Sequence, residues 1–244
     1  MEFSNSPLVS HTHLSPNHSG PRVYDISIIT PHCVVGHATV EGLGELFANP
    51  ARQASSNYGI DDQGRVGMYV EEKNRSWCSS SYENDQRAIT IELASDTTEP
   101  YAMSETVYNR LIDLCVDICQ RYGKKRLVWI PDKEKALSYK PDAEKMQLTV
   151  HRWFANKSCP GDWLFERLGD VAEQVTARLA ATAASTPSAA EQEDPGNVPS
   201  PWAAEAVNWA IQKKILLGDG TSYRLHDPVT REEMLTFLWR ARII

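Results

Sequence analysis

The chain of 244 residues contains no apolar run of about 18 residues or more, the length that a membrane-spanning helix needs. Its N-terminal segment, residues 1–20, is polar and lacks the basic start and apolar stretch of a secretion signal. Basic residues are outnumbered, with 25 Lys and Arg against 32 Asp and Glu and a net charge of −7. Proteins that follow nucleic-acid phosphates normally gather Lys and Arg on one face. We therefore expect a protein synthesised in the cytoplasm, with no membrane span and no nucleic-acid partner.

Cysteine is also scarce, since the chain has only five. An odd number, scattered over a chain that is large enough to bury a core, does not indicate a disulfide framework. Two of them stand four residues apart on the apolar side of a predicted helix, where a thiol packs as a small hydrophobic group. We predict that all are reduced, with Cys115 and Cys119 in the core: Cys33, Cys78, Cys115, Cys119 and Cys159.

Large apolar side chains are nearly missing from residues 181–200, ATAASTPSAAEQEDPGNVPS, where Val198 is the exception. Such a segment cannot bury a face, so we predict a flexible linker. It separates a main domain, residues 1–180, from a tail, residues 201–244. A tail of that size rarely folds alone without metal, disulfides or self-association.

Strand patterns occur at several places in the main domain. DISIIT (residues 25–30) predicts a buried strand that leads to His32, and AITIEL (residues 88–93) predicts a second strand. In the second strand Glu92 faces away from Ile91, because successive side chains alternate. SNYGI and VGMYV flank DDQG (residues 61–64), which predicts a hairpin.

Helical spacing of apolar residues marks residues 40–47, 104–122 and 164–179. In the second of these, Ser104 is a suitable N-cap and Gly123 a suitable stop. RLVWI (residues 126–130) predicts a further strand that ends at Pro131. Strands that alternate with helices predict an α/β fold around a central sheet.

One set of side chains has the composition of a zinc site. Zinc in enzymes is typically bound by three ligands drawn from His, Cys and carboxylates, with a fourth position open. HRWFANKSCPG (residues 151–161) supplies His151 and Cys159, and His32 lies at a predicted strand end. Spacing alone leaves the assignment open, because chance pairs of His and Cys are common and each residue could be packed or solvated instead.

From Pro16 to about Leu179 the chain resembles the type-2 N-acetylmuramoyl-L-alanine amidases, which share their fold with peptidoglycan recognition proteins. The resemblance is carried by SPNHSGPR, the strand into His32, SSNYGIDDQGRVGMYVEE, AITIEL and HRWFANKSCPG. It implies a mixed central β-sheet flanked by helices. It also implies that His32, His151 and Cys159 bind Zn²⁺.

The same resemblance implies two catalytic residues. Glu92 would move protons as general acid and base, and Lys157 would stabilise the oxyanion. An alternative for Glu92 is an ordinary ion pair on a strand. The chain departs from the family pattern at Trp77-Cys78, where a His commonly follows the Trp, and the resemblance leaves the substrate contacts of this loop open.

Three aromatic residues are expected near the predicted site, where each could stack on sugar or peptide: Tyr58, Trp77 and Trp153. Core packing is the alternative for all three. Cys33 follows His32 directly and, on a strand, points to the opposite face, so we predict that it packs in the core. His11 and His13 form an H-x-H in the N-terminal segment, a pattern that can bind a metal but is more often solvated.

The tail resembles one S-layer homology repeat, a helix-loop-helix unit. The resemblance rests on WAxxAVxWA (residues 202–210), the GDG turn (residues 218–220) and TREE (residues 230–233). It implies binding to secondary cell-wall polymer, through residues such as Trp202 and Arg231, whose guanidinium suits acidic sugar groups.

Repeat units of this kind normally bury their faces against neighbouring copies. A single copy therefore predicts either a wall-targeting module that forms homo-oligomers or a plain helical hairpin that dimerises the enzyme or docks on it. We favour targeting, because a tethered enzyme gains avidity on a polymeric wall.

These features predict a zinc-dependent peptidoglycan hydrolase, a phage endolysin or bacterial autolysin that acts on the wall after release. It would cut the amide between N-acetylmuramic acid and L-alanine of the stem peptide. The alternatives are a non-catalytic peptidoglycan-binding protein, which the presence of Cys159 disfavours, and a cytosolic enzyme for soluble muropeptides, which the wall-directed tail disfavours.

Overall fold

The computed structural model describes residues 3–185, 198–218 and 222–241, and the chain divides into two units, Met1–Ser185 and Thr186–Ile244. The predicted linker does not begin at residue 181, because helix α6 (Leu168–Ser185) continues through its first five residues. The sequence ATAAS is rich in alanine, the best helix former, so the helix extends beyond the buried Leu179. Residues 186–197 of the predicted linker lie outside the described residues.

A mixed sheet forms the centre of the first unit, as predicted, and all adjacent strands run parallel except the antiparallel hairpin of β4 and β5. In spatial order its strands are β1 (Val9–Thr12), β5 (Val66–Met68), β4 (Tyr58–Ile60), β7 (Ala88–Leu93), β3 (Ile28–Cys33), β9 (Lys145–Leu148) and β8 (Arg126–Val128). A separate antiparallel pair joins β2 (His18–Pro21) to β6 (Asn74–Ser76).

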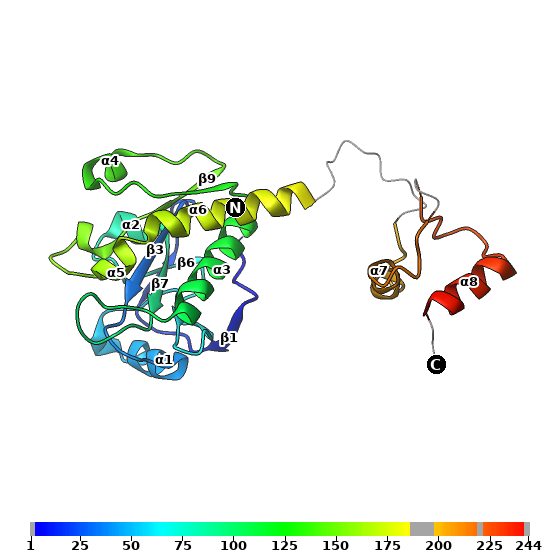
Figure 1. Ribbon diagram of the computed structural model, residues 1–244. Helices are drawn as coiled ribbons and strands as arrows, with labels where there is room; N and C mark the ends of the chain where they lie inside the picture. Colours follow the sequence, from blue (N-terminus) through cyan, green and yellow to red (C-terminus); the bar gives the residue numbers. More distant parts are fainter. Residues whose placement is uncertain (1–2, 186–197, 219–221, 242–244) are drawn as a thin grey trace. The chain divides into compact units, whose positions relative to one another are not determined.

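Alternation along β3 and β7 gives the sheet one apolar and one polar face. The apolar face belongs to the main core, together with side chains of α3 (Glu105–Arg121) and α6, and includes Ile29, Ile89, Ile91 and Leu93. Helices α3 and α6 pack side by side over the sheet (Figure 1). The intervening residues, which alternate to the other face, are Thr30, His32, Thr90 and Glu92.

Helix α3 has the ends that the sequence predicts. The Ser104 hydroxyl accepts a hydrogen bond from the backbone N–H of Val107, which caps the first turn. Gly123 follows the last turn with a φ of +64°, a left-handed conformation that glycine adopts without strain.

The remaining elements of the first unit are short: α1 (Val40–Ala48), η1 (Pro50–Arg52), α2 (Tyr82–Arg87), α4 (Lys133–Ser138), η2 (His151–Trp153) and α5 (Asp162–Phe165). The predicted strand 126–130 ends early, at Val128, and Trp129 leaves the ladder to stack on Trp153. The predicted helix 164–179 is divided, because α5 ends at Phe165, whose ring meets Trp129 edge-on, and α6 starts at Leu168.

The second unit contains α7 (Ala204–Gln212) and α8 (Arg231–Ala241), the helix-loop-helix order that the tail predicts. Thr230 and Glu233 form a capping box at α8, in which each side chain accepts the other residue's backbone N–H, at 3.1 and 2.8 Å. Of the predicted GDG turn, only Gly218 lies within the described residues. No helix in the described part of either unit has the length and apolar character needed to cross a bilayer.

Candidate metal centre

The polar face of the sheet ends in side chains that three neighbouring strands position. His32 is the penultimate residue of β3, and Glu92 pairs with it in register on β7. Strand β9 ends at Leu148 and leads within three residues to His151, the first residue of η2. The carboxyl ends of parallel strands share one edge of a sheet, where sites in α/β folds usually lie.

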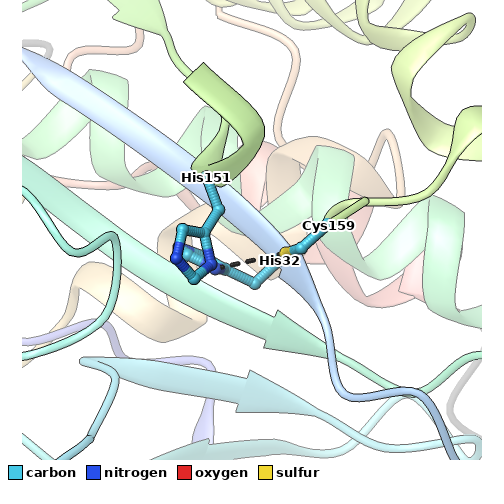
Figure 2. A group of neighbouring side chains, drawn as sticks. All are labelled: His32, His151 and Cys159. Atoms are coloured by element: carbon cyan, nitrogen blue, oxygen red, sulfur yellow. Dashed lines mark hydrogen bonds between the residues drawn. The ribbon is translucent and has the colours of Figure 1, made fainter. Parts of the chain in front are cut away.

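His32, His151 and Cys159 come together at this edge. Each offers one ligand atom, and the three atoms all lie within 4.8 Å of one another. The Sγ atom of Cys159 is 3.4 Å from Nδ1 of His32, the contact drawn as a dashed line in Figure 2. The two imidazole rings are tilted, with centroids 5.1 Å apart. Two nitrogens and one sulfur at this spacing suit a tetrahedral zinc ion with one position left open.

The hydroxyl of Ser80 orients the imidazole of His151. Its Oγ lies 3.1 Å from Nε2 of His151, and Ser80 itself has a left-handed backbone with a φ of +63°. Hydrogen bonds to the outer nitrogen commonly fix the ring of a metal-binding histidine. The bond at Nε2 leaves Nδ1 of His151 to act as the ligand atom.

The protonation states of the three residues suit cation binding. Burial and the neighbouring His151 lower the pKa of His32 to about 3. Burial, with the charge of Lys157, also lowers the pKa of His151. Both imidazoles are therefore neutral at pH 7, the form that binds a metal. A hydrogen bond with Cys33 and burial raise the pKa of the Cys159 thiol, so its proton has to be displaced when a cation binds.

Glu92 lies beside these residues with unusual surroundings for a carboxyl group. Burial raises its pKa to about 7. The thiol of Cys78 donates a hydrogen bond to Oε1 over 3.7 Å, and Oε2 is buried without a partner among the described residues. A carboxyl group of this kind can both accept and donate a proton near neutral pH.

An open cleft of about 740 Å³ gives access to the group, and His32, Glu92, His151 and Cys159 all line it. Lys157 is exposed on the same cleft, two residues before Cys159. The structure therefore brings together all five residues for which the sequence predicts a metal-binding or catalytic role.

The three aromatic predictions have different outcomes. Trp77 lines the cleft, and its indole N–H donates to Ser19 at 2.9 Å. The prediction that Tyr58 contacts substrate is wrong, because its ring is fully buried in the core and its hydroxyl donates to Glu72. The prediction for Trp153 is also wrong, because this ring packs in the core, stacked on Trp129 with centroids 5.2 Å apart.

The remaining cysteine and histidine predictions concern packing. All five cysteines are free thiols, and Cys33, Cys115 and Cys119 lie in the core, as predicted. His11 and His13 lie on and just after β1, an edge strand paired with β5. Neither joins a candidate metal group among the described residues.

The sequence did not predict that Asp85 holds the loop after β6 in place. The carboxylate of Asp85 accepts hydrogen bonds from the backbone N–H groups of Cys78 and Ser79, at 3.1 and 3.0 Å. Burial raises the pKa of Asp85, against the effect of these bonds. The pattern S-S-S-Y-E-N-D, a serine N-cap before a short helix, was the available signal. Asp85 thus fixes Cys78 next to Glu92.

In the second unit, the residues predicted to bind wall polymer are solvent-accessible. Trp202 is 89% exposed, and Arg231 is exposed at the first position of α8. Among the described residues of this unit, Ile215 is the sole buried one. The accessible ring and guanidinium are compatible with ligand binding, which remains a prediction.

Two family models match separate parts of the chain. A family model described as N-acetylmuramoyl-L-alanine amidase matches residues 24–162, and one described as S-layer homology domain matches residues 196–235. No curated protein matches the chain.

Among solved structures, AmiA shares the fold at low sequence identity. The hydrolase AmiA from Staphylococcus aureus, in complex with its ligand, is 14% identical, with 74% of this chain and 87% of that chain covered and a TM-score of 0.53. PlyL is 16% identical (72% and 97% covered, TM-score 0.47). An AmpD derivative is 18% identical (70% and 99% covered, TM-score 0.47). Because the amidase model covers more than half of the chain, this protein belongs to the N-acetylmuramoyl-L-alanine amidase family and carries an S-layer homology segment after its amidase domain.

Proposed function

We propose that this protein is a zinc-dependent peptidoglycan hydrolase that cuts the amide bond between N-acetylmuramic acid and L-alanine of the stem peptide. The observation that carries the proposal is the meeting of His32, His151 and Cys159 beside Glu92, in a cleft open to solvent. Family membership supports an amidase in general. The two imidazoles, the thiol and the neighbouring carboxyl group support zinc as the metal and amide hydrolysis as the reaction.

The three side chains fit a zinc ion in number, kind and protonation. They provide two neutral imidazoles and one thiol that becomes a thiolate on binding, with ligand atoms within 4.8 Å of one another. A bound zinc ion would supply Lewis acidity, polarising the amide carbonyl and making a water molecule acidic near pH 7.

Two residues of this chain then share the remaining work: one transfers protons and the other stabilises the developing negative charge. Glu92 takes a proton from the attacking water and returns it to the leaving nitrogen, which an amide needs in order to depart. Lys157, exposed on the same cleft, offers a positive charge to the oxygen that becomes negative. The size of the cleft, about 740 Å³, accommodates a sugar with its attached peptide.

For the second unit we propose binding to cell-wall polymer, which would hold the amidase on its insoluble substrate. The S-layer homology match and the exposed Trp202 and Arg231 support this role. Homo-oligomerisation through this unit would multiply weak contacts. The combination fits a phage endolysin or bacterial autolysin that acts on the wall after release.

Digestion of purified cell walls tests the enzymatic proposal. We expect the protein to expose new N-terminal alanine without new reducing sugar ends, and we expect a chelator to stop the reaction and added Zn²⁺ to restore it. New reducing ends would mean that the protein cuts glycosidic bonds instead. Binding to walls with no new ends of either kind, even with Zn²⁺ present, would indicate a non-catalytic recognition protein.

A further inference from the structure

A second group of ligand side chains lies directly beside the first. In the described part of the chain, two groups of His, Cys, Asp and Glu are close enough to hold a cation, and the second consists of His32, Cys78 and Glu92. Their ligand atoms also lie within 4.8 Å of one another. His32 is common to both groups, so the two would-be sites adjoin.

Two buried atoms of this second group have no partner among the described residues. Nδ1 of His32 faces Cys159, whereas Nε2 on the other side of the ring is unpaired in a residue that is only 1% exposed. Oε2 of Glu92 is also buried and unpaired. Because buried polar atoms normally find a partner, two unpaired atoms within one group of possible metal ligands indicate a bound ligand.

Cys78 completes the group and is held firmly in place. Its backbone N–H donates to Asp85, and its thiol already points at Glu92, 3.7 Å from Oε1. A ligand held by such supporting hydrogen bonds needs little rearrangement to bind. Cys78 and Glu92 both line the cleft, so a cation can reach them from solvent.

The donor set also has the charge that a divalent cation requires. When ionised, Cys78 and Glu92 carry two negative charges, which balance one such cation. A thiolate, an imidazole and a carboxylate together suit a borderline metal such as Zn²⁺ or Co²⁺ better than Mg²⁺ or Ca²⁺, which prefer oxygen ligands alone.

We propose that His32, Cys78 and Glu92 form a second, weaker site for a borderline divalent cation, joined to the primary site by the imidazole of His32. Nδ1 serves the primary site and Nε2 the second. Binding of the second cation releases the thiol proton of Cys78, the remaining ring proton of His32 and any proton on Glu92. This loss of protons makes the second site weaker than the first.

The effect of this site on the amidase rests on the proposed function. A cation on Glu92 withdraws the carboxylate from proton transfer, so excess Zn²⁺ inhibits the amidase. The same residues that line the cleft thus give the enzyme an inhibitory site for its own metal.

Cobalt titration of the metal-free, full-length protein tests the site without relying on activity. Co²⁺ bound to a thiolate gives an intense near-ultraviolet charge-transfer band. We expect wild type to bind two equivalents, counted by equilibrium dialysis, with the band growing in two phases. Cys78→Ser should lose the second equivalent and the second phase. Cys159→Ser should lose the charge-transfer band that accompanies the first equivalent.

Cys115→Ala serves as the matched control, because Cys115 is a core thiol that belongs to neither group and should leave both phases intact. A single equivalent in wild type, or a second phase that survives Cys78→Ser, overturns the proposal. Either result is independent of whether the protein digests walls, so failure of the second site and failure of the amidase proposal are distinguishable.

Wall digestion at increasing Zn²⁺ tests the inhibitory role. Wild type should lose most of its activity as the second equivalent of zinc binds. Cys78→Ser, measured against its own activity at one equivalent, should stay constant over the same range. Equal inhibition of both proteins would show that excess zinc acts elsewhere and would remove the inhibitory role.

Discussion

His32 and Glu92 occupy paired positions on adjacent parallel strands, β3 and β7. Their side chains therefore leave the sheet on the same face and at the same height. One provides a neutral imidazole, because burial lowers its pKa, and the other a carboxyl group whose pKa burial raises to about 7. The pairing places the proposed proton-transfer group next to a proposed metal ligand, and both are positioned by the strands themselves.

Replacing Glu92 by Gln should remove catalysis while leaving the primary metal group intact. General acid-base groups contribute roughly 10²- to 10⁴-fold to rate, so kcat on soluble muropeptide should fall by that order. Metal content at one equivalent, measured by atomic emission, should match wild type. Glu83→Gln, on the exposed side of α2, is the control and should keep full activity. Full activity in Glu92→Gln would exclude Glu92 from the mechanism.

Lys157→Met tests the oxyanion role. Removing a charge that acts only in the transition state should lower kcat by roughly 10²-fold and change KM little. Lys133→Met, an exposed lysine on α4, is a control for the loss of one positive charge. A rise in KM with unchanged kcat would instead assign Lys157 to substrate binding.

Tyr58→Phe should affect stability rather than activity. The Tyr58 hydroxyl donates to the fully buried Glu72, and its loss leaves that carboxylate short of one donor. Removing one partner of a buried hydrogen bond costs about 1–3 kcal/mol of unfolding free energy, which urea denaturation can measure. Tyr24→Phe, at a residue that is 43% exposed, should change little. A reduced kcat in correctly folded Tyr58→Phe would restore the substrate-contact hypothesis.

The ion pair of Glu41 with Arg65 should contribute to stability in a defined pH range. The hydrogen bond from Arg65 lowers the pKa of Glu41 from 4.5 to about 2. The unfolded chain therefore binds this proton more readily, so the contribution is present above pH 4.5 and is lost as pH falls toward 2. Both side chains are exposed, so the effect should be small and weaker in high salt.

Glu41→Gln should accordingly flatten the acid side of the stability profile between these pH values, measured by thermal unfolding in a buffer series. Glu45→Gln, an exposed carboxylate on the same helix, provides the comparison. An unchanged acid limb in Glu41→Gln would show that the pair contributes nothing measurable.

Deleting residues 201–244 should separate wall binding from chemistry. Because the amidase unit contains its own core, hydrolysis of soluble muropeptide should persist, while co-sedimentation with insoluble walls should weaken. Lower activity on walls than on soluble substrate would follow from lost avidity. Undiminished pelleting would favour the alternative in which the tail is a plain helical hairpin.

The sequence alone determined the elements that local pattern controls. Alternating AITIEL specified β7 and the face that Glu92 occupies, and Ser104 with Gly123 marked both ends of α3. Family motifs indicated the residues that the structure brings together in the cleft. Those motifs lie at or near strand ends, which meet at one edge of the sheet. The ends of two elements were harder to predict. The end of α6 depends on the helix propensity of its alanines, and the early end of β8 depends on ring packing. Neither follows from the spacing of apolar residues in the sequence.

Only the tertiary structure decided which side chains face the cleft and which face the core. The sequence placed Tyr58 and Trp153 at the site, but the packing of the sheet against α3 and α6 buries both. The same packing brings Cys78 to Glu92, through a loop that Asp85 holds from seven residues away. Such contacts depend on burial and hydrogen bonding between segments, and these appear only when the chain has folded and removed water from between them.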